Sequence, residues 1–138
     1  MLVDEIGTYL AGAGLGLTLA APSPNLFTTP FPLNAPEAAV CLVSLTGTVH
    51  GTFGVSLSAP AIADERWKVI VRDTRERAQA AQTLAQAIYK KLRRLGPVQL
   101  SGVQYHNVKA ELPAFLNFDD NQRPMYHFDC EAWKDESA

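Results

Sequence analysis

The sequence predicts an α+β domain in which two main helices pack on one face of a mixed, largely antiparallel sheet. Two observations lead to this fold class. Apolar residues recur at helical spacing in residues 2–12 and 74–96, and the remaining apolar runs have the lengths and alternation of strands. The chain has 138 residues, of which 47% are hydrophobic and 19% are charged. We therefore expect residues 1–138 to form a single folded domain.

The N-terminal element is predicted to be an amphipathic helix over residues 2–12, with Leu2, Ile6 and Leu10 on one face. Residues 22–36 contain five prolines in fifteen positions, which excludes a helix or a central strand. Their apolar side chains predict an ordered connection that lies against the domain. Residues 38–45 (AAVCLVSL) are continuously apolar, which is typical of a strand covered on both faces.

Residues 46–66 contain a strand pattern that glycines interrupt. Val49, Phe53, Val55 and Leu57 alternate with polar residues, and the three glycines between them permit bulges and bends. The spacing is compatible with an ordinary hairpin, which it favours, and with an extended β-arm that reaches towards a partner.

A strand and the strongest helix of the chain follow. In residues 66–73 (RWKVIVRD), Trp67, Val69 and Val71 fall on one face. The helix pattern covers residues 74–96 and ends at Gly96-Pro97, and Asp73 and Glu76 have the spacing of a capping box at its start. The apolar stripe of this helix consists of Ala81, Leu84, Ala85, Ile88, Leu92 and Leu95.

Four cations crowd the last turns of this helix: Lys90, Lys91, Arg93 and Arg94. Such a group can bind phosphate, but cations are also stabilised by about 0.3–1 kcal/mol each at the negative end of a helix. The formal net charge is −2 and there is no second basic cluster beside this one. The sequence therefore favours a solvated helix end over a nucleic-acid site.

The C-terminal third is predicted to form strands. Residues 98–112 indicate a strand with a bend at Ser101-Gly102, and residues 115–121 with Pro124 indicate a turn. A closing strand follows in MYHFDCEAW (125–133).

The closing strand places His127, Asp129 and Glu131 on one face. With His106 from a neighbouring strand they could ligate a metal ion, or they could be the polar face of a half-buried strand. Alternate residues on a strand lie about 7 Å apart and rarely converge on one ion. The sequence therefore favours the surface interpretation.

No motif predicts catalysis or a cofactor. The sequence lacks GxSxG, HExxH, CxxC and a complete GxGxxG. Cys41 and Cys130 lie in apolar runs, where burial lowers the reactivity of a thiol. The turn DDNQRP (119–124) lacks the later glycine and glutamate of a calcium loop. We therefore expect no catalytic, cofactor-binding or metal-binding residue.

Residues 10–21 have the apolar character of a signal peptide, but Asp4 and Glu5 precede them where a signal carries positive charge. The segment is also too short and too rich in glycine to span a bilayer. The expectation is a soluble protein that is made and folded in the cytoplasm and has no membrane partner.

Five segments, taken in order, resemble a known family. They are MLVDEIGTYLAGAGLG at the start, NLF at 25–27, WKVIVRD before the long helix, LSGVQY after it, and DDNQRPMYHFDCE near the end. Their order and spacing are similar to those of bacteriophage minor capsid proteins, which resemble the tail terminators of long-tailed phages. The resemblance covers most of the chain. Residues 46–66 depart from it, because they are longer and richer in glycine.

The resemblance implies a structural virion protein without catalysis and a mixed sheet flanked by helices. Tail terminators of this kind form a ring, commonly a homohexamer, on the head-proximal end of the tail tube. There they stop tube polymerisation and meet a head–tail connector or head-completion protein. Genomic DNA passes through the lumen, and a near-neutral chain suits passage without binding. The implied location is the tail or neck of the virion, with the host cytoplasm as the place of assembly.

Two alternatives stay open at this point. One is a different neck component, such as a head-completion protein, which is also small and forms rings. The other is a small metal-dependent enzyme that uses His106, His127 and Asp129.

A ring needs two different, complementary surfaces on each copy. The first predicted surface is the 46–58 arm, whose Phe53, Val55 and Leu57 lie against a neighbouring subunit by strand addition. The second is the turn at 117–123, whose mixed charges set the register against the tube or the connector. Its predicted contact residues are Asp119, Asp120 and Arg123.

Overall fold

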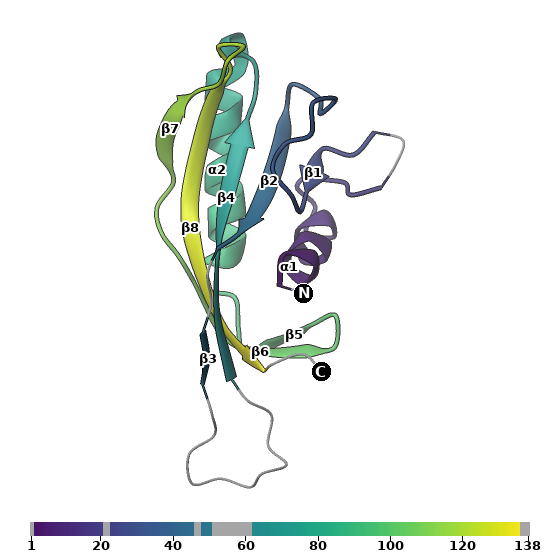
Figure 1. Cartoon of the computed structure of the whole chain (residues 1–138), viewed down its shortest axis with the longest axis vertical. Coiled ribbons are helices and arrows are strands. Elements are labelled where there is room, and N and C mark those ends of the chain that lie inside the picture. The colour runs from purple at the N-terminus through teal and green to yellow at the C-terminus, as the bar shows by residue number, and fades with distance from the viewer. Residues whose placement is uncertain (1, 21–22, 46–47, 51–61, 136–138) are drawn as a thin grey trace, which may run out of the picture.

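The computed structural model describes residues 2–20, 23–45, 48–50 and 62–135, and within them it contains one eight-stranded sheet and two α-helices (Figure 1). The strand order is β1-β2-β4-β8-β6-β5, with β3 also paired to β4 and β7 also paired to β8. In this sheet only β1 and β2 run parallel, and the other neighbouring strands are antiparallel. The predicted α+β fold class is confirmed.

The N-terminal helix α1 (Leu2–Ala11) forms where its periodicity predicted it. Ile6 and Leu10 are fully buried, and each such side chain contributes about 1.5–3 kcal/mol of hydrophobic stabilisation. The proline-rich connection then supplies the two-residue edge strand β1 (Leu26–Phe27), which pairs with β2. The predicted packing of this connection against the domain is confirmed, since Leu26 is buried in the core.

The centre of the sheet is built from three long antiparallel strands: β2 (Ala39–Ser44), β4 (Ile62–Arg72) and β8 (Pro124–Asp135). The first four residues of β2 are all buried, which confirms a strand covered on both faces. β4 pairs over its whole length with residues 125–135 of β8. β8 extends beyond its predicted strand at both ends, whereas β4 begins four residues earlier than predicted and ends one residue earlier. Trp67, Val69 and Val71 share the buried face of β4, as predicted.

The short strand β3 (Thr48–His50) pairs with the start of β4, from Ile62 to Asp64. The backbone of residues 48–50 therefore has the strand conformation that the alternation predicted. Phe53, Val55 and Leu57 lie outside the described residues, so the choice between hairpin and arm stays a prediction.

The long helix begins later than predicted. A 3-10 turn, η1 (Arg75–Arg77), precedes α2 (Ala78–Leu92), and the residue before α2 makes no side-chain cap. The predicted capping box of Asp73 and Glu76 is wrong, because the Asp73 carboxylate accepts from the Thr74 N–H at 2.7 Å and pairs with Arg77 at 3.4 Å. Within α2, the buried stripe is Ala81, Ala85, Ile88 and Leu92.

β5 (Val98–Leu100) and β6 (Val103–Ala110) form a hairpin whose two-residue turn is Ser101-Gly102. Both turn residues have positive φ, 51° and 80°, as a tight hairpin requires. The predicted bend at this position is confirmed. The predicted turn over residues 115–121 is partly wrong, because β7 (Ala114–Phe118) is a strand and the turn occupies only residues 119–123.

Both helices contribute to one core on the same side of the sheet. The core joins the apolar stripes of α1 and α2 to Leu42, Trp67, Val69 and Phe128 from neighbouring strands. In Figure 1 the viewer faces the other side of the sheet, with α2 behind β4 and β8. The structure therefore has one helix-covered face and one open face.

A buried charged group ties the first helix to the last strand. Lys134 Nζ donates to Glu5 Oε1 at 2.8 Å, and the Tyr105 hydroxyl donates to the same carboxylate at 2.7 Å. The Lys134 side chain is 1% exposed and that of Glu5 is 6% exposed. Glu65 adds a third partner, 3.3 Å from Lys134. Burial, together with the Glu5 carboxylate, raises the pKa of Tyr105, so it stays a hydroxyl donor.

Candidate functional site

The turn between β7 and β8 is held by Asp119. Its carboxylate accepts from the backbone N–H of Asn121 at 2.9 Å and of Arg123 at 2.8 Å, and from Arg123 Nε at 2.6 Å. Burial opposes ionisation of this carboxyl, but the donors outweigh it, so the pKa of Asp119 lies below its ordinary value. Of the three predicted contact residues, the structure therefore brings Asp119 and Arg123 together inside the turn and leaves Asp120 exposed.

Arg72 connects this turn to the proline-rich connection. Its guanidinium donates to the carbonyl oxygens of Pro36 at 2.7 Å and Glu37 at 3.3 Å, and its Cζ lies 4.2 Å from the centre of the Phe31 ring. Asp119 Oδ2 lies 4.0 Å away from it. Burial, followed by the charge of Arg123, lowers the pKa of Arg72. Nothing in the sequence pattern signalled this link, because its members are far apart along the chain.

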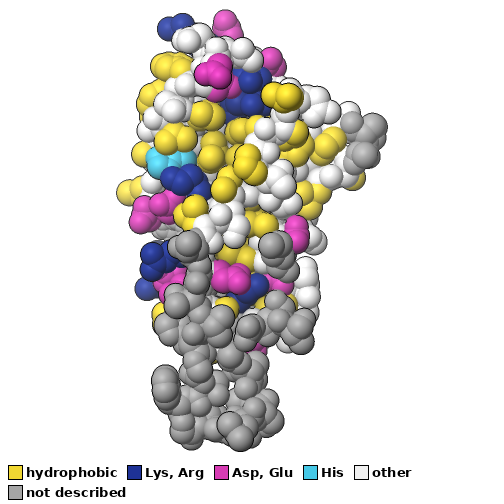
Figure 2. Space-filling model, viewed as in Figure 1, with side chains coloured by type: hydrophobic (Ala, Val, Ile, Leu, Met, Phe, Trp, Pro, Cys, Tyr) yellow, Lys and Arg dark blue, Asp and Glu magenta, His cyan; other side chains and the backbone are white. Residues whose placement is uncertain are grey.

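The open face of the sheet carries alternating charges in register across strands. Arg66 Nε lies 3.3 Å from Glu131, and Lys68 Nζ lies 3.3 Å from Asp129 and donates to His127 Nδ1 at 3.2 Å. The predicted common face of His127, Asp129 and Glu131 is confirmed, and it is a surface in which cations of β4 neutralise carboxylates of β8. Figure 2 shows this face, with hydrophobic side chains over its middle and charged side chains above and below them.

His106 and His127 do not converge on one site. His106 Nε2 donates to Asp135 at 2.7 Å, and Asp135 is eight residues beyond His127 on β8, which is roughly 25 Å of strand. Within the ranges that the structure describes, no three His, Cys, Asp or Glu side chains are placed to hold a metal ion. The geometry required for the alternative metal enzyme is therefore not formed by His106, His127 and Asp129.

The two cysteines are buried thiols. Burial raises the pKa of Cys41 to about 12. Burial also raises the pKa of Cys130, and the nearby carboxylates of Asp129 and Glu111 add to the effect. Neither thiol has the lowered pKa of a nucleophile.

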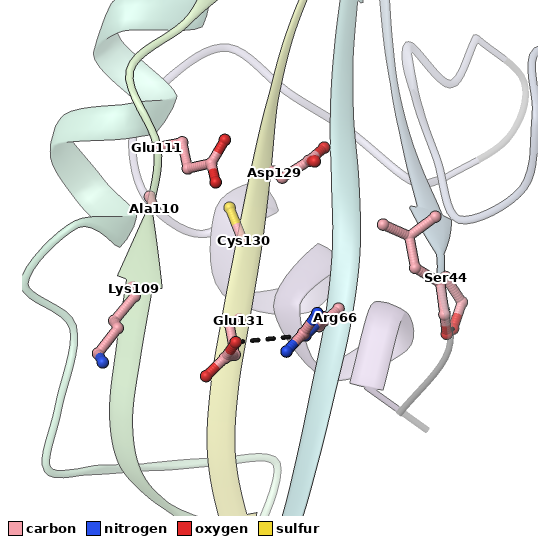
Figure 3. Close-up of a pocket in the computed structure, with 9 residues that line it drawn as sticks. Ser44, Arg66, Lys109, Ala110, Glu111, Asp129, Cys130 and Glu131 are labelled. Carbon is pink, nitrogen blue, oxygen red and sulfur yellow. Dashed lines mark hydrogen bonds and ion pairs between the residues drawn. The ribbon is translucent and has the colours of Figure 1, made fainter. Parts of the chain in front are cut away.

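A hollow of about 1000 Å³ opens on this face. Its walls include Arg66, Lys109, Glu111, Asp129 and Glu131, contributed by β4, β6, β8 and the residue after β6 (Figure 3). Only the pair of Arg66 and Glu131 is joined across it in Figure 3. Sequence reasoning missed this hollow, because it depends on the register of strands that are distant in sequence.

Strand β7 is an exposed edge strand that the sequence did not predict. Phe115 is 49% exposed and Phe118 is 45% exposed. The two rings stack edge-on at 5.2 Å, and Phe115 also contacts Tyr126 at 5.7 Å. Among the described strands, β7 pairs only with β8, so its other edge has no partner there. Exposed aromatic side chains beside such an edge are typical of a surface that meets another protein.

The predicted basic helix end is exposed in the structure. The side chains of Lys90, Lys91, Arg93 and Arg94 are all at the surface, and that of Arg93 lies over the Tyr89 ring at 5.7 Å. None of the four pairs with a carboxylate in the part of the chain that the structure describes, whereas most other cations do.

No described helix is long and apolar enough to cross a bilayer.

Comparisons with known proteins agree with the fold. A family model described as "Bacteriophage tail terminator protein" matches residues 9–135. A chain in a solved structure titled "Virion of native gene transfer agent (GTA) particle" superimposes with a TM-score of 0.70 at 14% sequence identity, and the match covers 98% of this chain and 95% of that chain. No curated protein matches the sequence significantly.

Proposed function

This chain belongs to the bacteriophage tail terminator family and is a structural protein of the virion, and on that premise we propose that it closes into a homohexameric ring on the head-proximal end of the tail tube. The ring ends tube polymerisation and presents its other side to the head–tail connector or to a head-completion protein. Genomic DNA passes the lumen without specific binding. Assembly takes place in the host cytoplasm, and the protein catalyses no reaction.

The observation that carries this proposal is the extent of the family match, which runs from the last turn of α1 to the end of β8 and so includes every strand of the sheet. The open face and the helix-covered face support it, because a ring of identical copies needs two different surfaces on each copy. The chain of the gene transfer agent virion that superimposes on this one supports the fold that such a ring would use.

The proposed contacts with neighbours lie in two segments. Phe53, Val55 and Leu57 of the 46–58 arm contact the adjacent subunit. The turn before β8 sets the register against the tube or the connector, with Asp120 as its exposed charge and with Asp119 and Arg123 holding its shape.

Light scattering at several protein concentrations, with negative-stain imaging of any large species, tests the ring. The expected result is a species of six copies that images as a ring. Phe53→Ser with Leu57→Ser should abolish it and leave a folded monomer. Leu33→Ser is the matched control, since Leu33 is a fully exposed leucine outside both segments, and it should assemble normally. Assembly of the arm variant at the wild-type concentration would show that the arm is not a subunit contact.

A further inference from the structure

The edge strands of the sheet differ in how well they are protected. β1 has two residues and β5 has three, and each places a leucine in the core, Leu26 and Leu100. β7 has five residues, all of them exposed, and none is charged or a proline. Natural sheets shorten their edge strands or place charged residues or proline on them, because an open edge pairs with other strands. Residues 114–118, here called the β7 edge, use none of these devices.

The backbone of the β7 edge has hydrogen-bonding groups that point away from the sheet. The Asp119 N–H donates to the Arg123 carbonyl at 3.0 Å, and Phe118, one residue before it, faces Pro124. Successive residues of an antiparallel ladder point their N–H and C=O groups to opposite sides, and proline has no N–H to donate. The N–H and C=O of Phe118 therefore point away from β8, where an added strand would pair with them.

Apolar side chains accompany these backbone groups. Phe115 and Phe118 are both about half exposed and contact each other, and Leu116 between them is also exposed. A second strand with apolar residues at alternate positions would remove this area from water and pack against it. The β7 edge therefore fits an uncharged, extended segment that carries apolar side chains at every second position.

The chain itself contains a segment of this kind. In the 46–58 arm, Phe53, Val55 and Leu57 occupy alternate positions, and no residue of the arm is charged. These three residues lie outside the described ranges, but β3, at the start of the arm, already has the backbone conformation of a strand. The composition of the arm thus matches the composition of the β7 edge.

The arm cannot reach the β7 edge of its own copy. His50 pairs with Ile62 at the start of β4, and Ile62 pairs with Asp135. β7 pairs with β8 no nearer than His127, which lies roughly 25 Å along the strand from Asp135. Residues 51–61 leave and return at one place, so they extend by about five residues, or roughly 17 Å. Figure 1 shows β3 and β7 at opposite ends of the sheet, so an arm on the β7 edge must come from a second copy.

We propose that the arm of one copy adds as a strand to the β7 edge of the next copy. This contact rests on the proposed ring and names the surface that receives the arm. Because the arm and the β7 edge belong to opposite ends of the sheet, the contact joins unlike ends of two copies, which is the heterologous arrangement of a closed ring. Main-chain hydrogen bonds supply the affinity, and the alternate apolar side chains set the register.

Phe118→Pro tests the receiving edge, because it removes the outward N–H together with the aromatic ring. Light scattering and negative-stain imaging should show rings only at a protein concentration about a hundred-fold or more above that of the wild type. Leu33→Pro is the matched control. Leu33 is fully exposed and follows Pro32 in a turn that the Ala35 N–H closes, a position that favours proline. It should assemble as the wild type does, and circular dichroism and the urea midpoint establish that both variants are folded.

Disulfide trapping identifies the partner while Phe118 stays intact. One population carries Leu116→Cys, and the other carries a cysteine in place of Thr52, Gly54 or Ser56, which alternate with the apolar residues of the arm. A disulfide requires two β-carbons about 3.5–4.5 Å apart, so mixed rings should give a linked dimer for at least one arm position. Thr8→Cys is the control, since Thr8 is exposed on α1, which packs near β1, β2 and β5, and it should give no linked dimer.

The outcomes separate the inference from the function it rests on. Wild-type rings together with normal assembly of Phe118→Pro, or mixed rings without a linked dimer at any arm position, would overturn the strand addition and leave the ring intact. Linkage of Leu116→Cys copies to one another would show that β7 pairs with β7, which also overturns the inference. A wild-type chain that stays monomeric at every concentration and salt would overturn both the strand addition and the self-assembled ring.

Discussion

Replacing Lys134 should destabilise the domain more than any surface change. Lys134→Met removes the cation that joins β8 to α1 and leaves the Glu5 carboxylate buried without it, with the Tyr105 hydroxyl as a remaining donor. Removing one partner of a buried ion pair costs about 3–5 kcal/mol. The side chains are 1% and 6% exposed, so water does not replace the lost partner. Out of a total stability of about 5–15 kcal/mol, this loss is severe.

Removing both charges should cost less than removing Lys134 alone. Glu5→Leu combined with Lys134→Met removes both members of the buried pair. The remaining penalties are the Tyr105 hydroxyl without its acceptor, about 1–3 kcal/mol, and the buried Glu65 Oε2 without the Lys134 cation 3.3 Å away. Urea unfolding followed by circular dichroism gives both values and their coupling. Lys109→Met is the matched control, because Lys109 is an exposed lysine on the adjacent strand.

Two results would refute this reasoning. One is a loss below about 1 kcal/mol for Lys134→Met, which would mean that the pair is solvated. The other is a double variant whose loss equals the sum of the two single losses, which would mean that Glu5 and Lys134 act independently.

Three further predictions follow from local contacts. Asp119→Asn should lower the free energy of unfolding by about 1.5–3 kcal/mol near neutral pH. Because folding lowers the pKa of Asp119, this contribution is complete above the pKa of the unfolded carboxyl and is lost as the pH falls through the folded pKa. The urea midpoints of the two proteins should therefore converge in acid. Arg72→Lys should lose the hydrogen bonds to the carbonyl oxygens of Pro36 and Glu37 and the stacking on the Phe31 ring. Limited proteolysis within residues 23–37 should then be faster than in the wild type, and an unchanged rate would contradict the role of Arg72. Cys41 and Cys130 should not react with a disulfide reagent at neutral pH until urea unfolds the protein, because their thiols are buried and their pKa values are raised, and prompt labelling of the folded chain would be the contrary result.

The sequence predicted the elements whose side chains alternate between core and solvent. Ile6 and Leu10 on α1, and Trp67, Val69 and Val71 on β4, are buried as their spacing indicated. Burial imposes on apolar residues a period of 3.6 in a helix and of 2 in a strand, so these elements can be predicted from the sequence alone. The common face of His127, Asp129 and Glu131 was predictable for the same reason.

Elements without such a period were missed or misplaced. All five residues of β7 are exposed, so its run AFLNF shows no alternation of apolar and polar residues. The sequence therefore predicts a turn over most of this strand. The start of α2 was misplaced because the Asp73 carboxylate binds Thr74 and Arg77 instead of capping the helix.

The candidate site was predictable only in part. Asp119, Asp120 and Arg123 were identified as a group, but their division into an internal pair and one exposed carboxylate depends on the turn geometry. The hollow and the burial of Lys134 depend on pairing between strands whose partners lie up to 73 positions apart, from Ile62 to Asp135, and no local pattern records such pairing.

The most direct test of the central claim is tail-tube polymerisation with the purified chain present. Tail tube protein from the same phage is polymerised with increasing amounts of gold-labelled chain, and tube lengths and label positions are measured by electron microscopy. A tail terminator should stop elongation at far fewer copies than there are tube subunits, with label at one end of each tube. Tubes that grow to their usual lengths, or label spread along their sides, would contradict the assignment.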